Sequence, residues 1–148
     1  MASVESPAVP GAMAGYSGTP LPKKLGIRPG DRVVLSGAPR GFAGTLGELP
    51  EGARTTPRMS AGAAVILLFV RSKAQLHARL PRAEAALAEG GKLWIVWPKK
   101  ASGVPSDLSE AVVRAAGLAR GLVDYKIAAV DATWSGLCFA RRTRPAGR

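Results

Sequence analysis

Two lysines and a serine follow directly on one of the most apolar segments of the chain. The apolar residues 93–97 lead, after one proline, into Lys99, Lys100, Ser102 and Gly103. In open α/β sheets, ligands bind outside the carboxyl ends of the strands. Two ammonium groups, a hydroxyl and a glycine N–H at such a place can hold a phosphate or a carboxylate. We therefore expect an anion-binding turn here, with a solvated loop on a basic protein as the alternative.

A second polar group lies between the last two apolar segments. Asp131, Thr133 and Trp134 stand at the connection between residues 122–130 and 133–141. Asp131 could orient a lysine or act as a base, and Trp134 could stack on a ligand ring. Aspartate and threonine are also ordinary turn residues, and Trp134 could instead cap the core. The second interpretation is slightly favoured.

A third group follows the apolar residues 32–36. In Gly37-Ala38-Pro39-Arg40-Gly41, the forked guanidinium of Arg40 could bind a phosphate, and Gly37 and Gly41 would shape the turn. A tight turn that leaves Arg40 in solvent is equally consistent with these residues.

The N-terminal region carries a polar segment of its own. It could fold over the site as a lid, or it could be a disordered arm with solvated lysines. Its polar residues are Tyr16, Ser17, Thr19, Lys23 and Lys24.

The elements that must position these residues can be expected from apolar patterning. Apolar runs without alternation are typical of strands that helices bury on both faces. The connection between the last two segments is only about two residues long, which forces an antiparallel hairpin. We expect a three-layer, Rossmann-like α/β fold whose mostly parallel sheet ends in this hairpin. The expected strands are 32–36, 53–56, 63–70, 93–97, 122–130 and 133–141, and the expected helices are 21–25, 42–46, 72–89 and 107–119.

Two of the expected helices have an apolar stripe. The first begins at the N-cap Ser72 and contains Pro81, which should bend it or open a second helix. The second should begin after the N-cap Ser106. The inward residues are expected to be Leu76, Leu80, Ala83 and Leu87 in the first, and Leu108, Val112, Ala115 and Leu118 in the second.

Because the carboxyl ends of parallel strands share one edge of a sheet, the three polar groups should line one crevice. The candidate ligand-binding residues are Lys99, Lys100, Ser102, Gly103, Gly37, Arg40, Gly41, Asp131, Thr133 and Trp134.

The charge balance favours anionic partners. Lysine and arginine outnumber aspartate and glutamate by 21 to 10, a net charge of +11. Such a chain attracts phosphate-containing small molecules and nucleic acid alike. A surface that is merely well solvated is an equal alternative.

Composition also bounds the class of protein. A single cysteine, Cys138, excludes an intrachain disulfide and makes a reducing cytoplasm the expected compartment. Together with a single histidine, His77, it excludes a His/Cys zinc site within one chain, and we expect no metal. Residues 61–70 are too short to cross a membrane. We expect a disordered arm at 1–14, one domain at 15–142 and a basic tail at 143–148.

Two resemblances follow from these elements and strings. The element order, the terminal hairpin and the segment 90–96 resemble a trimmed S-adenosylmethionine-dependent methyltransferase fold. Three strings resemble an uncharacterised bacterial family of small basic proteins, a domain of unknown function. They are YSGTPLPKKLG at 16–26, WPKKASG at 97–103 and VDATWSG at 130–136.

The chain departs from the methyltransferase pattern in two places. That family cradles its cofactor with a glycine-rich loop after the first strand and holds the ribose with an acid after the second. Here Pro39 removes a backbone donor from the loop. After the second expected strand come Pro57, Arg58 and Met59, without a carboxylate.

Three functions therefore remain open. The first is a non-catalytic or weakly catalytic Rossmann-like module that binds an anionic ligand or partner at the carboxyl edge of its sheet. The alternatives are a divergent S-adenosylmethionine-dependent methyltransferase and a nucleic-acid-associated basic protein. The chain has no P-loop, no Gly-x-Ser-x-Gly motif and no paired carboxylates at helical spacing, so no catalytic residue is assigned.

Overall fold

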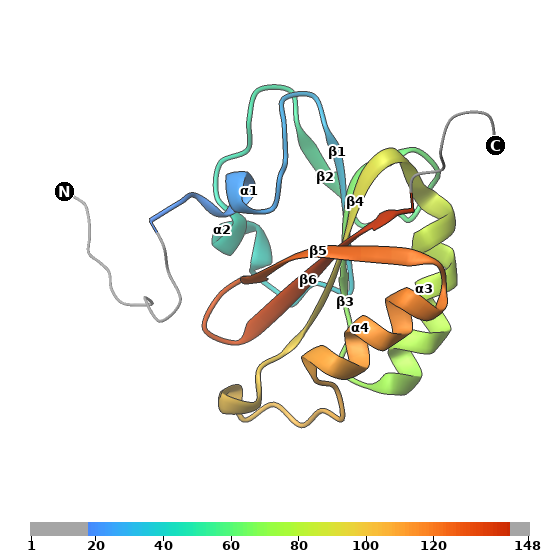
Figure 1. Ribbon diagram of the computed structural model, residues 1–148. Coiled ribbons are helices and arrows are strands. Elements are labelled where there is room, and N and C mark those ends of the chain that lie inside the picture. Colours follow the sequence, from blue (N-terminus) through green and yellow to red (C-terminus); the bar gives the residue numbers. More distant parts are fainter. Residues whose placement is uncertain (1–17, 143–148) are drawn as a thin grey trace, which may run out of the picture.

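Six strands form one sheet in the order β2-β1-β3-β4-β6-β5 (Figure 1). The computed structural model describes residues 18–142. All neighbouring pairs from β2 to β4 are parallel, whereas β6 runs antiparallel to both β4 and β5. This confirms the expected mostly parallel sheet with a terminal antiparallel hairpin. The strands are β1 (Arg32–Ser36), β2 (Arg54–Thr56), β3 (Ala63–Phe69), β4 (Leu87–Pro98), β5 (Leu122–Ala129) and β6 (Trp134–Arg141).

Helices cover the two faces of the sheet unequally. The two long helices, α3 and α4, lie together on one face, and the short α1 and α2 lie on the other (Figure 1). A single 3-10 turn, η1, follows β4. The helical elements are α1 (Leu21–Lys24), α2 (Phe42–Leu46), α3 (Lys73–Ala86), η1 (Lys100–Ser102) and α4 (Glu110–Ala119).

The two central strands explain why their sequences lack alternation. Every residue from Val65 to Phe69 in β3 and from Leu93 to Val96 in β4 has no solvent exposure. Side chains on both faces of these strands are therefore core residues, as expected for strands between two helical layers. The Trp94 indole N–H also donates to the Leu25 carbonyl at 2.9 Å, which ties the sheet to the segment after α1.

Helix α3 begins where the sequence predicts and ends earlier. The Ser72 hydroxyl caps it by accepting from the Gln75 N–H at 3.1 Å. The helix ends at Ala86 rather than at residue 89, because Leu87 already pairs with Ala63 as part of β4. Pro81 lies within one uninterrupted helix, so of the two expected outcomes, a bend or a second helix, the second is wrong.

Helix α4 presents a different face from the one expected. It begins after the N-cap Ser109, and its buried residues are Val113, Ala116 and Gly117. A Cβ on Gly117 would lie 2.1 Å from the Phe139 ring, so only the smallest residue fits against β6 here. The predicted start at Ser106 and the predicted inward positions of Ala115 and Leu118 are therefore wrong. Both of these residues are exposed, Leu118 by 44%.

The carboxyl edge of the sheet collects the ends of five strands. The ends of β1, β2, β3, β4 and β5 lie there together with the start of antiparallel β6, since Pro98 pairs with Trp134. Within residues 18–142, no helix combines the length and the apolar character needed to span a membrane.

Candidate functional site

A single arginine joins the ends of two strands at the point where the strand order reverses. From β1 the chain goes to β2 on one side, and β3 lies on the other side. Ligands of open α/β sheets bind in the crevice outside such a switch point. There the Arg79 side chain of α3 donates from Nη1 to the Phe69 carbonyl at 2.6 Å and from Nη2 to Ser36 Oγ at 2.5 Å. Arg79 is thus fixed at the place where the topology predicts a ligand.

The first residue after β1 is shaped to admit this guanidinium. Gly37 has φ +74°, and a Cβ on it would lie 2.8 Å from Arg79 Nη2 and 2.9 Å from the Phe69 carbonyl oxygen. Both the backbone conformation and the close approach favour glycine. The predicted loop residue Gly37 therefore has a structural partner, Arg79, that the sequence analysis did not single out.

Among residues 18–142, no carboxylate forms an ion pair with Arg79. Partial burial and, second, the nearby Arg71 lower the pKa of Arg79 below its ordinary value. Among residues 18–142, the ion pairs are those of Arg114 with Glu110 and Asp124 and of Arg120 with Glu84. A partly buried cation without a counter-charge is unfavourable, and a bound anion would remove that penalty.

Two further arginines line a cavity next to Arg79. A cavity of about 520 Å³ lies between α3, the end of β1 and the segment that follows β2. Arg58 comes from the segment after β2, and Arg79 and Arg82 come from α3. Among the described residues, no aspartate or glutamate lines its wall. The lining residues are Ser36, Pro57, Arg58, Met59, Leu68, Ala78, Arg79 and Arg82. We call this the arginine cavity.

The same architecture occurs in solved methyltransferases. A candidate type 11 methyltransferase from Sulfolobus solfataricus superposes with a TM-score of 0.58 and 13% identity, over 86% of this chain and 93% of that one. TrmN from Thermus thermophilus gives 0.54 and 16%, over 89% of this chain and 50% of that one. A SAM-dependent O-methyltransferase from Thermotoga maritima gives 0.53 and 12%, over 83% and 64% respectively. The chain has a methyltransferase-like fold.

Beyond this fold, the comparisons are silent. No protein-family model and no curated protein matches the chain. The identities to the solved methyltransferases are between 12% and 16%, which supports a shared architecture and not a shared activity. The likeness of the three sequence strings to a family of unknown function stays a prediction.

The methyltransferase-like fold implies S-adenosylmethionine, and the structure shows whether the residues fit it. A cavity of about 340 Å³ lies between the segment Gly37–Ala43 and the end of β2 at Thr55 to Pro57. None of its lining residues is acidic, so a ribose would lack the carboxylate that the family provides. Pro39 offers no N–H, and its carbonyl accepts from the Phe42 N–H at 3.1 Å. The residues present do not fit this cofactor in the family's manner.

The turn expected to bind an anion uses its own donors. Ser102 Oγ donates to the Lys99 carbonyl at 2.6 Å and accepts from the Val104 N–H at 3.1 Å. The Gly103 N–H donates to the Lys100 carbonyl at 3.4 Å. The hydroxyl and the N–H expected to cradle an anion thus hold the turn together. Within residues 18–142, neither Lys99 nor Lys100 belongs to an ion pair, and the predicted role of their ammonium groups stays a prediction.

The structure brings the second polar group next to this turn. The Lys99 N–H donates to the Thr133 carbonyl at 2.8 Å, so the two predicted groups are in contact. Asp131 Oδ1 accepts from the N–H groups of Thr133 and Trp134, at 2.8 and 2.9 Å. Asp131 therefore stabilises the turn, as the alternative interpretation held, and it does so through Oδ1.

Trp134 is a core residue. Its ring is 4% exposed, meets the Phe69 ring edge-to-face with centroids 5.2 Å apart, and carries the Arg71 guanidinium 5.1 Å above it. This packing favours the core interpretation over stacking on a ligand. The cation–π contact also places Arg71 on the carboxyl edge near Arg79.

The remaining candidates differ in their exposure. Arg40 lies exposed on its loop, and Gly41 adopts φ +83° as the N-cap of α2. In the segment expected to form a lid, Thr19 and Lys24 line a cavity described below, and Lys23 is exposed. Tyr16 and Ser17 lie outside the described residues, as do the expected arm and basic tail.

The sequence analysis missed Arg79, although a signal was present. Arg79 lies three residues after Leu76 and four before Ala83, so it borders the apolar stripe that docks α3 on the sheet. A cation beside a buried stripe must find a buried acceptor, which here is the end of β3.

The single histidine and the single cysteine of the chain lie in different environments. His77 is exposed, and burial raises the pKa of the core residue Cys138 to about 11. Within residues 18–142, no cluster of three His, Cys, Asp or Glu side chains could hold a metal.

Proposed function

We propose that this protein binds a small anionic ligand, of the phosphate or carboxylate class, in the arginine cavity at the switch point of its sheet. The observation that carries the proposal is the Arg79 guanidinium, which is anchored to Ser36 and Phe69 and lacks a carboxylate partner among the described residues. Charge-assisted bonds from a fixed guanidinium are strong and directional.

The wall of the cavity supports a ligand with more than one negative charge. Each Nη atom of Arg79 spends one N–H on the protein, which leaves others for a ligand. Arg58 and Arg82 add two further cations from separate elements. A volume of about 520 Å³ accommodates a phosphorylated metabolite.

The lining residues of the arginine cavity favour ligand binding over catalysis. Of the lining residues that the structure describes, only Ser36 carries a nucleophilic hydroxyl. That hydroxyl accepts from Arg79, and the described lining includes no histidine, aspartate or glutamate that could take its proton. Nucleophilic catalysis needs such a base within hydrogen-bonding reach.

Thermal denaturation with added pyrophosphate or adenosine monophosphate tests the proposal. Both probes should raise the melting temperature of the full chain in a saturable manner. Arg79→Gln and Arg82→Gln should each raise the probe concentration needed for half-maximal stabilisation by about tenfold or more. Arg28→Gln is the matched control, because it removes the same charge from an exposed residue at the opposite, amino edge.

Two outcomes would overturn the proposal. One is the absence of any saturable stabilisation by either probe. The other is an equal loss in Arg28→Gln and Arg82→Gln, which would show that only the net charge matters. Arg82 is exposed on α3, so its variant keeps the test valid even if Arg79→Gln fails to fold.

A divergent methyltransferase is the second candidate, and the shared fold is the observation that favours it. Calorimetry with S-adenosylmethionine and its demethylated product decides this point. Saturable binding of both at concentrations below about 1 mM would support it. Absence of binding would leave the fold without the activity.

A nucleic-acid partner is distinguished in the same titrations. An oligonucleotide held by the overall charge loses affinity steeply with salt and at a rate set by the number of phosphates contacted. A small anion held in the arginine cavity should depend far less on salt, because the pair is partly shielded from water.

A further inference from the structure

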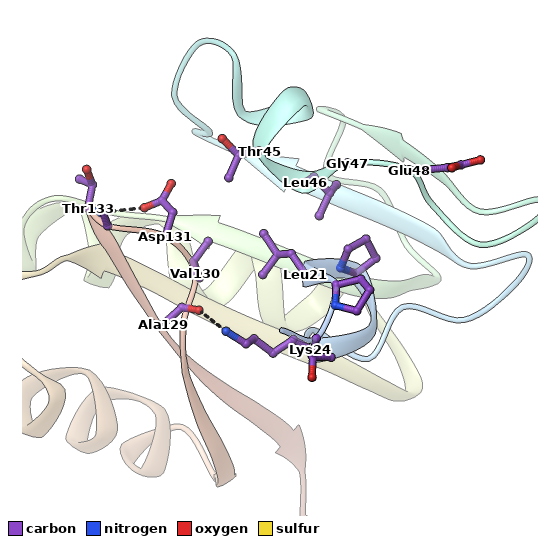
Figure 2. Close-up of a pocket in the computed structure, with 14 residues that line it drawn as sticks. Leu21, Lys24, Thr45, Leu46, Gly47, Glu48, Ala129, Val130, Asp131 and Thr133 are labelled. Atoms are coloured by element: carbon purple, nitrogen blue, oxygen red, sulfur yellow. Dashed lines mark hydrogen bonds between the residues drawn. The ribbon is translucent and has the colours of Figure 1, made fainter. Parts of the chain in front are cut away.

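A larger cavity lies on the opposite face of the same sheet edge. It has a volume of about 750 Å³ and lies between α1, the end of α2 and the turn that joins β5 to β6 (Figure 2). Its described lining residues include no arginine and none of those that line the arginine cavity. We call it the turn cavity.

Its floor is apolar. The side chains of Leu21, Leu46 and Val130 gather at its centre (Figure 2), and Pro20 and Pro22 are further apolar lining residues. Such a surface favours the hydrocarbon part of a ligand, since burying it removes apolar area from water.

One wall of the turn cavity presents an unused acceptor. Asp131 Oδ1 is occupied by the N–H groups of Thr133 and Trp134. Within residues 18–142, no protein donor is found for the other oxygen, Oδ2. Figure 2 shows this oxygen on the side that faces Thr45 across the cavity. The turn therefore orients the Asp131 carboxylate so that Oδ2 can accept hydrogen bonds from a ligand in the cavity.

Lys24, which also lines the turn cavity, does not neutralise this carboxylate. Lys24 Nζ donates to the Ala129 carbonyl at 3.1 Å, which holds its ammonium group at the floor (Figure 2). Neither Asp131 nor Glu48, at the far rim, belongs to an ion pair among the described residues. In a chain of net charge +11, a cavity with two unpaired carboxylates is complementary to a cation.

We propose that the turn cavity binds a small organic amine, with its ammonium group on Asp131 and its hydrocarbon part on Leu21, Leu46 and Val130. The ammonium donates to Asp131 Oδ2, and the hydroxyls of Thr133, next to Asp131, and of Thr45, across the cavity, are further acceptors among the lining residues. This site is independent of the proposed anion site, because the two differ in face, lining and charge.

Calorimetry with three probes of one shape tests the charge requirement. Phenethylamine, 2-phenylethanol and phenylacetate present the same ring with a cationic, a neutral and an anionic end. Phenethylamine should bind the full chain, the alcohol about tenfold or more weakly, and phenylacetate not at all. Equal binding of the alcohol would overturn the role of Asp131, and no binding of the amine up to about 10 mM would overturn the site.

Three variants locate the binding. Asp131→Asn keeps an oxygen for the Thr133 and Trp134 N–H groups while it removes the charge, so amine affinity should fall about tenfold with the fold retained. Asp107→Asn is the matched control, because Asp107 also caps a backbone N–H, that of Lys73, but lies outside the turn cavity.

The third variant keeps the proposal testable if Asp131→Asn fails to fold. Thr45→Lys adds a competing ammonium at an exposed position of the cavity wall and should abolish amine binding. Unchanged amine affinity in both Asp131→Asn and Thr45→Lys would overturn the proposal. The pyrophosphate titration separates the two sites, since neither variant should alter it.

Discussion

The arginine cavity and the turn cavity open at the same sheet edge on opposite faces, with opposite charge. In the arginine cavity, the central cation belongs to a long helix and is held by buried acceptors at the ends of two strands. In the turn cavity, the central anion belongs to a turn and caps the backbone of that same turn. The first charge is fixed by tertiary packing and the second by local structure. Changes at Arg79 or its contacts should therefore disturb stability, whereas changes at Asp131 should mainly disturb binding.

The largest effect is expected at the glycine beneath Arg79. Gly37→Ala must adopt φ near +74° and place its Cβ 2.8 Å from Arg79 Nη2 and 2.9 Å from the Phe69 carbonyl oxygen. Left-handed strain and the clash together should cost about 3 kcal/mol of unfolding free energy. Urea denaturation measures this change. Pyrophosphate binding should fall as well, because Arg79 is displaced.

A second glycine separates strain from packing. Gly41 has φ +83°, but a Cβ on it would meet nothing within 4 Å. Gly41→Ala should therefore cost only the backbone strain, about 1 kcal/mol. An equal loss in the two variants would show that the contact with Arg79 contributes nothing, and would weaken the view that the arginine cavity is held by packing.

The next largest effect should come from giving the arginine cavity the carboxylate it lacks. Arg82→Glu places an acid beside Arg79 and Arg58, where it would act as an internal counter-charge. Pyrophosphate affinity should fall by about a hundredfold or more, with little loss of stability. Arg54→Glu makes the same charge change at the start of β2, on the opposite edge, and should change the affinity by less than about threefold. Similar losses in both would indicate long-range attraction alone.

The sequence predicted the sheet well because the relevant signals were local. The unbroken apolar run of β3 indicated burial on both faces, and the short connection before β6 required a hairpin. The face of α4 was predicted wrongly because it depends on Phe139, a residue of another element that leaves room only for Gly117. The periodicity of apolar residues within one element does not predict which residues of a distant element it contacts.

The candidate sites show the same division. The common edge of the polar groups followed from strand direction, and the contact between Lys99 and Thr133 shows it for two of the three groups. The expected single crevice is wrong, because Gly37 and Gly41 line one cavity and Asp131 and Thr133 line another. Arg79 was missed because its acceptors, Ser36 and Phe69, are 43 and 10 residues away in sequence. The hydroxyl of Ser102 was read as free, whereas it closes its own turn. A motif thus indicates which groups are present, and the fold decides which of them remain available.

A smaller effect is expected when both cavities are filled together. Arg79 and Asp131 share no hydrogen bond, and the buried residues 65–69 of β3 and 93–96 of β4 lie between the two faces. Phenethylamine affinity measured with and without saturating pyrophosphate should therefore agree within about threefold. A larger change would reveal coupling, for which Phe69 is the available route, since its carbonyl accepts from Arg79 and its ring packs on Trp134.

The smallest effect should come from a carboxylate that already has its cation. Arg114 donates to Asp124 at 2.7 Å, and this hydrogen bond lowers the pKa of Asp124 in the folded protein. The stabilisation is therefore present above the pKa that Asp124 has in the unfolded chain. It is lost as the pH falls through the lower pKa that Asp124 has in the folded protein. Asp124→Asn should lower the stability slightly in neutral buffer and not at all in acid, as urea denaturation at the two conditions would measure. Asp131→Asn, which breaks no ion pair, should leave the neutral-pH stability nearer to that of the parent protein. The opposite ranking would mean that Asp131 already has a cationic partner, and the turn cavity would then offer no free charge to an amine.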